Sequence, residues 1–142
     1  MQEQLISFET AKLAKEKGFN WGCYIEYEVE DYEYRQGSPG YSKVTIKKGD
    51  LKKADGSSIF RNWNNNYSAP TQSLLQKWLR EKHKLYVYIN PTTYGEEARY
   101  SAQLDGYGKK GIFSSPLIDG FTIYNSYEEA LEEGLHEALK LI

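Results

Sequence analysis

Two hydrophobic periods follow one another between residues 67 and 89, and this change constrains the fold more than any other feature. The apolar residues from Leu74 to Leu79 recur at the spacing of a helix face. Those from Leu85 to Ile89 alternate with tyrosines, which is the pattern of a half-buried strand. The polar junction at 81–84 leaves room only for a tight turn. A helix leading directly into a strand is therefore predicted.

A shorter helix is expected near the start of the chain. Ser7 can cap its first amides, and Gly18 suits the position just after its end. Its apolar stripe is thin, so we expect this helix to lie on the surface of a larger body.

The residues from Tyr24 to Tyr34 alternate, with apolar side chains on one face and Glu26, Glu28 and Glu30 on the other. A turn signal at 37–40 and a second alternating run at 42–47 follow. The two runs are expected to pair as an antiparallel hairpin in which glutamates face lysines. This pairing explains both charge clusters without a bound cation, because carboxylates two residues apart on a strand diverge.

The second half of the chain predicts further strands and one secure helix. Residues 48–58 suit a loop, and Asn90-Pro91 is expected to end the strand that starts at Leu85. Strands are expected at 98–104, 112–113 and 121–124. The run 106–111 matches G-x-G-x-x-G, but no helix follows it, so a glycine-rich hairpin turn is favoured over an anion-contacting loop.

Ser126 and Glu129 form a capping box that opens a helix reaching the last residue. One face of this helix is apolar and the other is acidic, and the acidic face suits either plain solvation or a basic partner. Within the helix, Gly134 indicates close backbone packing. The elements together predict a single α+β domain over residues 1–142, a mostly antiparallel sheet with about three helices packed on one side.

Composition excludes several classes of protein. The chain has 142 residues and a formal net charge of −2, so no overall field attracts it to nucleic acid or anionic membranes. A single cysteine, Cys23, excludes an internal disulfide, and two histidines without a second thiol leave no zinc set. No apolar run is long enough to span a bilayer. A soluble, cytoplasmic protein without a metal or cofactor is expected.

The best candidate for a binding site is the loop from Arg61 to Tyr67 with the helix start after it. Trp63 and Tyr67 offer flat faces, and Arg61 offers a fork for phosphate. Amides after Pro70 can cap an anion. The alternative is that Trp63 fills the core and the asparagines are turn residues. The candidate ligand-binding residues are Arg61, Trp63, Asn66, Tyr67, Thr71, Gln72, Arg80, Lys109 and Lys110.

Three blocks of the chain, 7–13 (SFETAKL), 67–81 (YSAPTQSLLQKWLRE) and 126–135 (SYEEALEEGL), resemble a group of small uncharacterised proteins of phages and mobile elements from gut bacteria. The resemblance covers about a quarter of the chain and carries no catalytic residues with it. It implies an accessory protein that acts in the cytoplasm of an infected or element-carrying bacterium. Such proteins often bind and neutralise a host factor, sometimes a nucleotide signal used in defence.

No arrangement of nucleophile and base is evident, so the chain favours a binding protein over an enzyme. The leading hypothesis is sequestration of a small anionic, nucleotide-like ligand. The second is inhibition of a host protein through the acidic C-terminal helix or a tyrosine-rich sheet face. A third, single-stranded nucleic-acid binding, is disfavoured by the acidic balance. We expect no membrane partner, and the sequence leaves open whether the chain forms a homo-oligomer.

Overall fold

Helices and antiparallel strands make up the computed structural model, which describes residues 3–32, 41–52, 66–108, 111–116 and 123–142. The predicted α+β class is confirmed. In chain order the described elements are α1 (Phe8–Glu16), β1 (Cys23–Tyr32), β2 (Tyr41–Lys52), β3 (Asn66–Ser68), α2 (Gln72–His83), β4 (Leu85–Tyr94), β5 (Glu97–Gly108), β6 (Gly111–Pro116) and α3 (Tyr127–Lys140).

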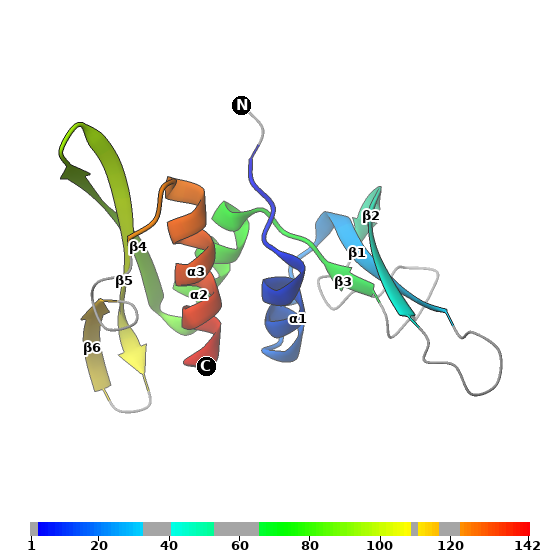
Figure 1. The fold of residues 1–142 in the computed structure, drawn as a ribbon. Helices are drawn as coiled ribbons and strands as arrows, with labels where there is room; N and C mark the ends of the chain where they lie inside the picture. Colours follow the sequence, from blue (N-terminus) through cyan, green and yellow to red (C-terminus); the bar gives the residue numbers. More distant parts are fainter. Residues whose placement is uncertain (1–2, 33–40, 53–65, 109–110, 117–122) are drawn as a thin grey trace.

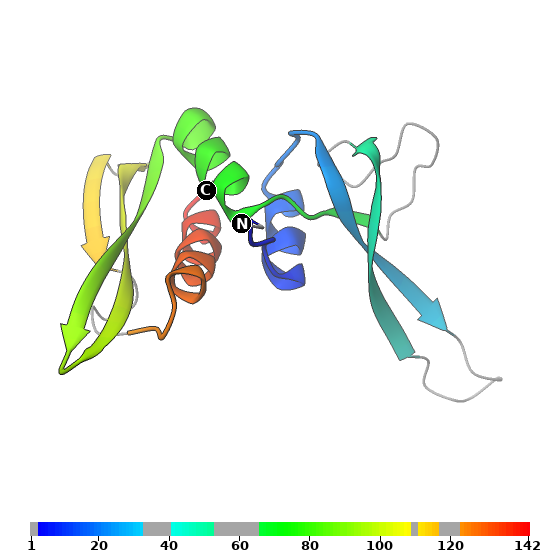
Figure 2. The same cartoon turned by 90° about the horizontal axis from the view of Figure 1, so that it is seen from above.

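The described strands form two three-stranded sheets, whereas one sheet was expected. The first sheet has the order β2-β1-β3 and the second the order β4-β5-β6. Figures 1 and 2 show the three helices lying between the two sheets. The chain crosses from one sheet to the other through α2, whose 12 residues span about 18 Å. The sequence pattern describes each strand but not which strands share a sheet.

One hydrophobic cluster joins side chains from both sides of this arrangement. Leu75 and Leu79 of α2 and Leu135 and Leu139 of α3 are completely buried within it. Trp78 is buried as predicted, and its ring lies edge-on to Phe19 with 5.2 Å between centroids.

The predicted starts of α1 and α3 are confirmed, whereas α3 ends at Lys140 and not at the last residue. The Ser7 and Ser126 hydroxyls accept hydrogen bonds from the amides three residues further on, so both serines are N-caps. For α2 the sequence favours Pro70 at the first helical position with Ser68 or Ala69 as cap, and gives Thr71 as the other register. Thr71 is the cap, since its hydroxyl accepts from the Leu74 amide at 3.3 Å. Gly18 follows α1 with a φ of 87°, a left-handed conformation that favours glycine.

Four described strands, β2, β4, β5 and β6, are longer than expected. β2 continues to Lys52, where a loop from residue 48 was predicted, and β4 continues through Pro91 to Tyr94. Pro91 is tolerated because Tyr100, its partner in β5, exchanges both backbone hydrogen bonds with Tyr124 on its other side. The Pro91–Tyr100 pair therefore needs no amide from residue 91.

Gly108 pairs with Gly111 across β5 and β6, which agrees with the predicted hairpin, and residues 109–110 between them lie outside the described part. Of the strand expected at 121–124, residues 121–122 lie outside the described part, and Tyr124 forms a single bridge with Tyr100. Gly106 lies in β5 opposite Leu85, where the two strands approach closely.

Replacing Gly106 with alanine tests this close approach. An added Cβ would lie 2.7 Å from both the Lys84 carbonyl oxygen and Leu85 Cδ2. Because a backbone oxygen cannot move aside easily, we expect the free energy of unfolding to fall by about 1–3 kcal/mol, measured by urea denaturation. Ser101→Ala in the same strand is the control, with an expected change within about 0.5 kcal/mol. Equal stabilities for the two variants would contradict the close packing.

Candidate binding groove beside helix α3

Only part of the predicted ligand site can be placed. Arg61, Trp63, Lys109 and Lys110 lie outside the described residues. Asn66 is buried in β3, where its Nδ2 donates to Glu26 Oε1 at 3.3 Å.

Tyr67 is half-buried and its ring is engaged within the protein. The ring lies edge-on to Phe8 with 5.4 Å between centroids, and Lys15 Nζ lies 4.7 Å from the ring centroid. Tyr67 therefore does not stand clear of the protein as a stacking surface. Arg80 is exposed near the far end of α2, away from the helix start.

The start of α2 is covered by the N-terminal segment, which we define as residues 3–7. The Gln72 amide, expected to be available to an anion, donates to the Gln4 carbonyl oxygen at 2.9 Å. Ser73 Oγ donates to Glu3 Oε1 at 2.7 Å, so a carboxylate of the protein itself lies at this helix end. The positive end of the α2 dipole is thus already matched by a negative charge.

The acidic face of α3 is not wholly solvated, because Glu132 binds two other elements. Its Oε1 accepts from the Ser7 amide at 2.8 Å and from Thr10 Oγ1 at 2.6 Å. Its Oε2 accepts from Gln72 Nε2 at 3.2 Å. One carboxylate therefore ties the starts of α1 and α2 to α3, an arrangement that the sequence did not indicate.

Further polar contacts surround Glu132. Tyr27 Oη donates to the Ile6 carbonyl oxygen at 2.6 Å. Burial, with a smaller contribution from the charge of Glu132, raises the pKa of the Tyr27 phenol above its ordinary value. His136 Nδ1 lies 3.3 Å from Thr10 Oγ1, so this histidine contacts α1 in addition to lying near the end of its own helix.

Two glutamates of the β1 row are buried, although the alternation in the sequence does not say which face lies inside. Glu26 and Glu28 are only 1% and 7% exposed. They are tolerated in the interior because Asn66 donates to Glu26 and Lys47 forms an ion pair with Glu28. The predicted pairing of glutamates with lysines across β1 and β2 is confirmed by the strand register.

The face of β2 that carries Val44 and Ile46 is partly exposed. Val44 and Ile46 are 42% and 57% accessible to solvent. They lie two residues apart and so point to the same side of the strand. This face borders the N-terminal segment, since Ile46 pairs with Tyr27, whose hydroxyl donates to the Ile6 carbonyl oxygen.

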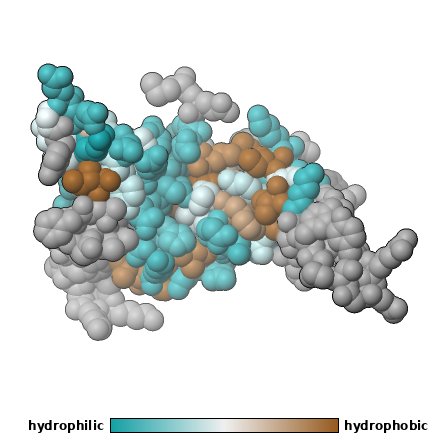
Figure 3. Space-filling view, viewed as in Figure 1, coloured by the Kyte–Doolittle hydropathy of each residue, from teal (hydrophilic) through white to brown (hydrophobic). Residues whose placement is uncertain are grey.

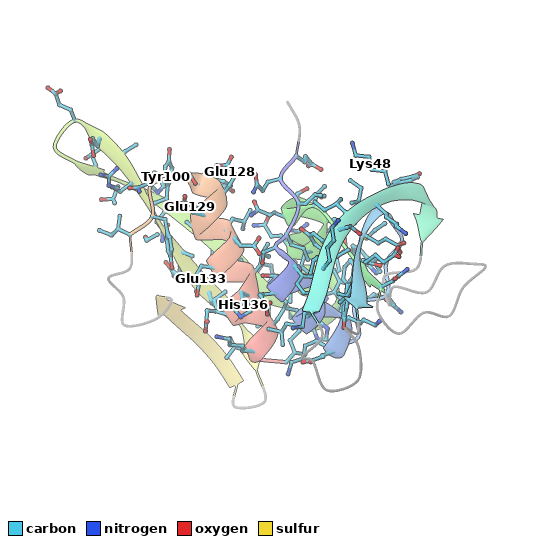
Figure 4. The ribbon with its side chains drawn as sticks, turned by 45° about the vertical axis from the view of Figure 1, so that its right-hand side comes forward. Lys48, Tyr100, Glu128, Glu129, Glu133 and His136 are labelled. Atoms are coloured by element: carbon cyan, nitrogen blue, oxygen red, sulfur yellow. The ribbon has the colours of Figure 1, made fainter. Side chains whose placement is uncertain are left out.

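A groove of ≈ 960 Å³ separates this face from α3, and we call it the α3 groove. The N-terminal segment lies along it, and Ile46 and Tyr27 belong to the side formed by the first sheet. Figure 4 shows Glu128, Glu129 and Glu133 projecting from α3. In Figure 3 the surface is hydrophilic over α3 and hydrophobic toward the first sheet. The described residues that line the α3 groove include neither lysine nor arginine. They are Glu3, Gln4, Leu5, Ile6, Ser7, Tyr27, Ile46, Tyr124, Ser126, Glu128, Glu129, Glu132 and Glu133.

The described residues offer little for catalysis. Burial raises the pKa of the Cys23 thiol from 9.0 to about 12, so this cysteine keeps its proton at neutral pH and is a poor nucleophile. His83 packs against Trp78 with 4.5 Å between ring centroids, and burial lowers its pKa. Among the described side chains, no three acidic, histidine or cysteine residues are grouped to hold a metal ion.

Comparison with known proteins gave no match to this chain among family models, curated proteins or solved structures. Within the part that the structure describes, no helix is both long and apolar enough to cross a membrane. We therefore interpret the function of the α3 groove from the charge and polarity of the residues that line it.

Glu132→Gln tests the contact that shapes this groove. The new glutamine would place its NH₂ group against the NH₂ group of Gln72. Gln72 cannot easily turn away, because its NH₂ group also donates to the Glu128 carbonyl oxygen. We expect the free energy of unfolding to fall by about 1–3 kcal/mol in urea denaturation, as for a half-buried polar group that loses its partner.

Glu133→Gln is the matched control, since it removes the same charge one residue along the helix. We expect it to change the free energy of unfolding by no more than about 0.5 kcal/mol. Equal losses in the two variants would show that net charge, and not the contacts of Glu132, stabilises the fold.

Proposed function

We propose that this protein is a non-catalytic binding protein that holds a basic, amphipathic segment of a partner protein in the α3 groove. The observation that carries the proposal is the pairing of an acidic side on α3 with an apolar side on β2. A segment with lysine or arginine on one face and apolar side chains on the other complements both sides at once.

The electrostatic part of this complementarity rests on Glu128, Glu129 and Glu133. In the described part of the chain none of the three forms an ion pair, and the groove lining holds no cation. Carboxylates of one sign along a groove attract a basic segment and favour its correct orientation. Their contribution falls as salt rises, because exposed charges are screened.

The apolar part rests on Ile46, with Val44 beside it on the same strand face. Both side chains are accessible in the isolated chain. Burying them under apolar side chains of a partner supplies the hydrophobic centre that stable interfaces have, while the glutamates supply the polar rim.

The same groove argues against an anionic guest, since its carboxylates repel a nucleotide. The nucleotide hypothesis rests on Arg61, Trp63 and Tyr67 beside the helix start after Pro70. Because Arg61 and Trp63 lie outside the described residues, it stays a prediction. The likeness to phage proteins makes a protein of the bacterial host the partner that we propose.

Selection of short peptides from a display library against the purified protein tests this function. We expect the enriched peptides to combine lysine or arginine with apolar residues. Binding of one such peptide, measured by fluorescence anisotropy, should weaken by about tenfold or more in a variant with glutamine at 128, 129 and 133. Ile46→Thr should also weaken it.

Matched controls distinguish an effect of the groove on binding from an effect of overall charge or hydrophobicity. Glutamine at Glu9, Glu81 and Glu96 removes the same charge from exposed sites outside the groove, and Ile123→Thr changes another exposed isoleucine. We expect these controls to bind as the original protein does. Enrichment of acidic peptides, or equal losses in groove and control variants, would contradict the proposal.

A further inference from the structure

The outer face of the second sheet carries a pair of parallel tyrosine rings. Leu85 and Val87 of β4 are buried toward the helices, so Tyr86 and Tyr88 point to the opposite face. Their ring centroids are 6.4 Å apart and the ring planes differ by 9°. Tyr88 is 46% exposed. Figures 1 and 2 show that the helices cover only the other face of this sheet.

A row of polar side chains runs beside these rings. In the strand register Tyr86 lies opposite Asp105 and Tyr88 opposite Gln103. Asn90 Nδ2 donates to Gln103 Oε1 at 3.2 Å, and Gln103 Nε2 donates to Asp105 Oδ1 at 3.2 Å. These hydrogen bonds link three planar polar groups in a row beside the aromatic pair.

We infer that this face, the tyrosine platform of Tyr86, Tyr88, Asn90, Gln103 and Asp105, binds a neutral sugar chain. One face of a pyranose ring presents C–H bonds, which pack on the electron-rich face of a tyrosine. Its hydroxyl groups both donate and accept, and amide and carboxylate groups match them in pairs. Neighbouring aromatic and planar polar rows provide both kinds of contact for consecutive sugars.

The charge of the platform selects a neutral ligand over a phosphate-bearing one. Asp105 is its one ionisable acid, and none of its five members is a cation. Arg99, further along the same face of β5, forms an ion pair with Glu97. Single-stranded nucleic acid also stacks on aromatic rings, but it requires a positive groove along its backbone. A polymer fits better than a small molecule, because sites for small molecules are concave and an open sheet face is not.

Electrophoresis in native gels that contain xylan, mannan or β-glucan tests the platform. We expect at least one of these neutral polysaccharides to retard the protein relative to a gel without sugar. Tyr88→Ala should weaken the affinity by about tenfold, and Tyr88→Phe, which keeps the ring, should retain most of it. Tyr86→Ala provides a second test of the ring pair.

Tyr24→Ala is the matched control, because Tyr24 is 68% exposed on β1 of the first sheet. It should be retarded as the original protein is, and so should the variant with glutamine at 128, 129 and 133, since this inference is independent of the α3 groove. No retardation by any of the three polysaccharides would overturn the inference. Equal loss in Tyr24→Ala, or tyrosine-dependent binding of an oligothymidine in place of sugar, would also overturn it.

Discussion

The hydrogen bonds of the Glu132 carboxylate are the contact on which the arrangement of the helices depends. The starts of α1 and α2 converge on this one side chain of α3. Each helix start carries a partial positive charge, which a nearby carboxylate stabilises. Thr10 and Gln72 are 1% and 4% exposed, so without this carboxylate two buried polar side chains would lose a partner. Glu132 therefore allows polar helix ends to meet inside the protein.

The position of the α3 groove follows from this convergence, and that of the tyrosine platform follows from the packing of the helices on the second sheet. Because Glu132 binds the Ser7 amide, the N-terminal segment lies along α3 and completes one side of the α3 groove. Because α2 and α3 pack on the inner face of the second sheet, the tyrosines of β4 are left on its outer face. The helices thus form a central layer. The α3 groove lies beside this layer, and the tyrosine platform lies on the outer face of the second sheet.

Local features of the fold could be predicted from the sequence because they depend on neighbouring residues. The change of period between Leu79 and Leu85 marks the end of α2 and the start of β4, and the serine caps mark α1 and α3. The division into two sheets could not be predicted, since a period describes one strand and not which strands pair. β3 was missed because it has three residues and no period of its own. Alternation also assigns two faces to β1 without saying which is buried, and here Glu26 and Glu28 are buried on one face and Tyr27 on the other.

The candidate site was harder to predict for the same reason. Glu132 reads as one of several glutamates on a solvated helix face, and its partners Ser7 and Thr10 lie 125 and 122 residues away in the chain. The helix start after Pro70 looked available to an anion because the N-terminal segment that covers it has no recognisable period. Contacts between distant segments leave no local pattern, whereas capping and periodicity do.

Amide hydrogen exchange at Ser7, followed by NMR, tests the central contact most directly. Ser7 is an exposed residue that precedes its helix, so its amide is protected only if it donates to Glu132. We expect slow exchange in the original protein and fast exchange in Glu132→Ala, with Leu75 in the core protected in both. Exchange at Ser7 as fast as in an unfolded peptide would contradict the proposal that Glu132 joins α1 to α3.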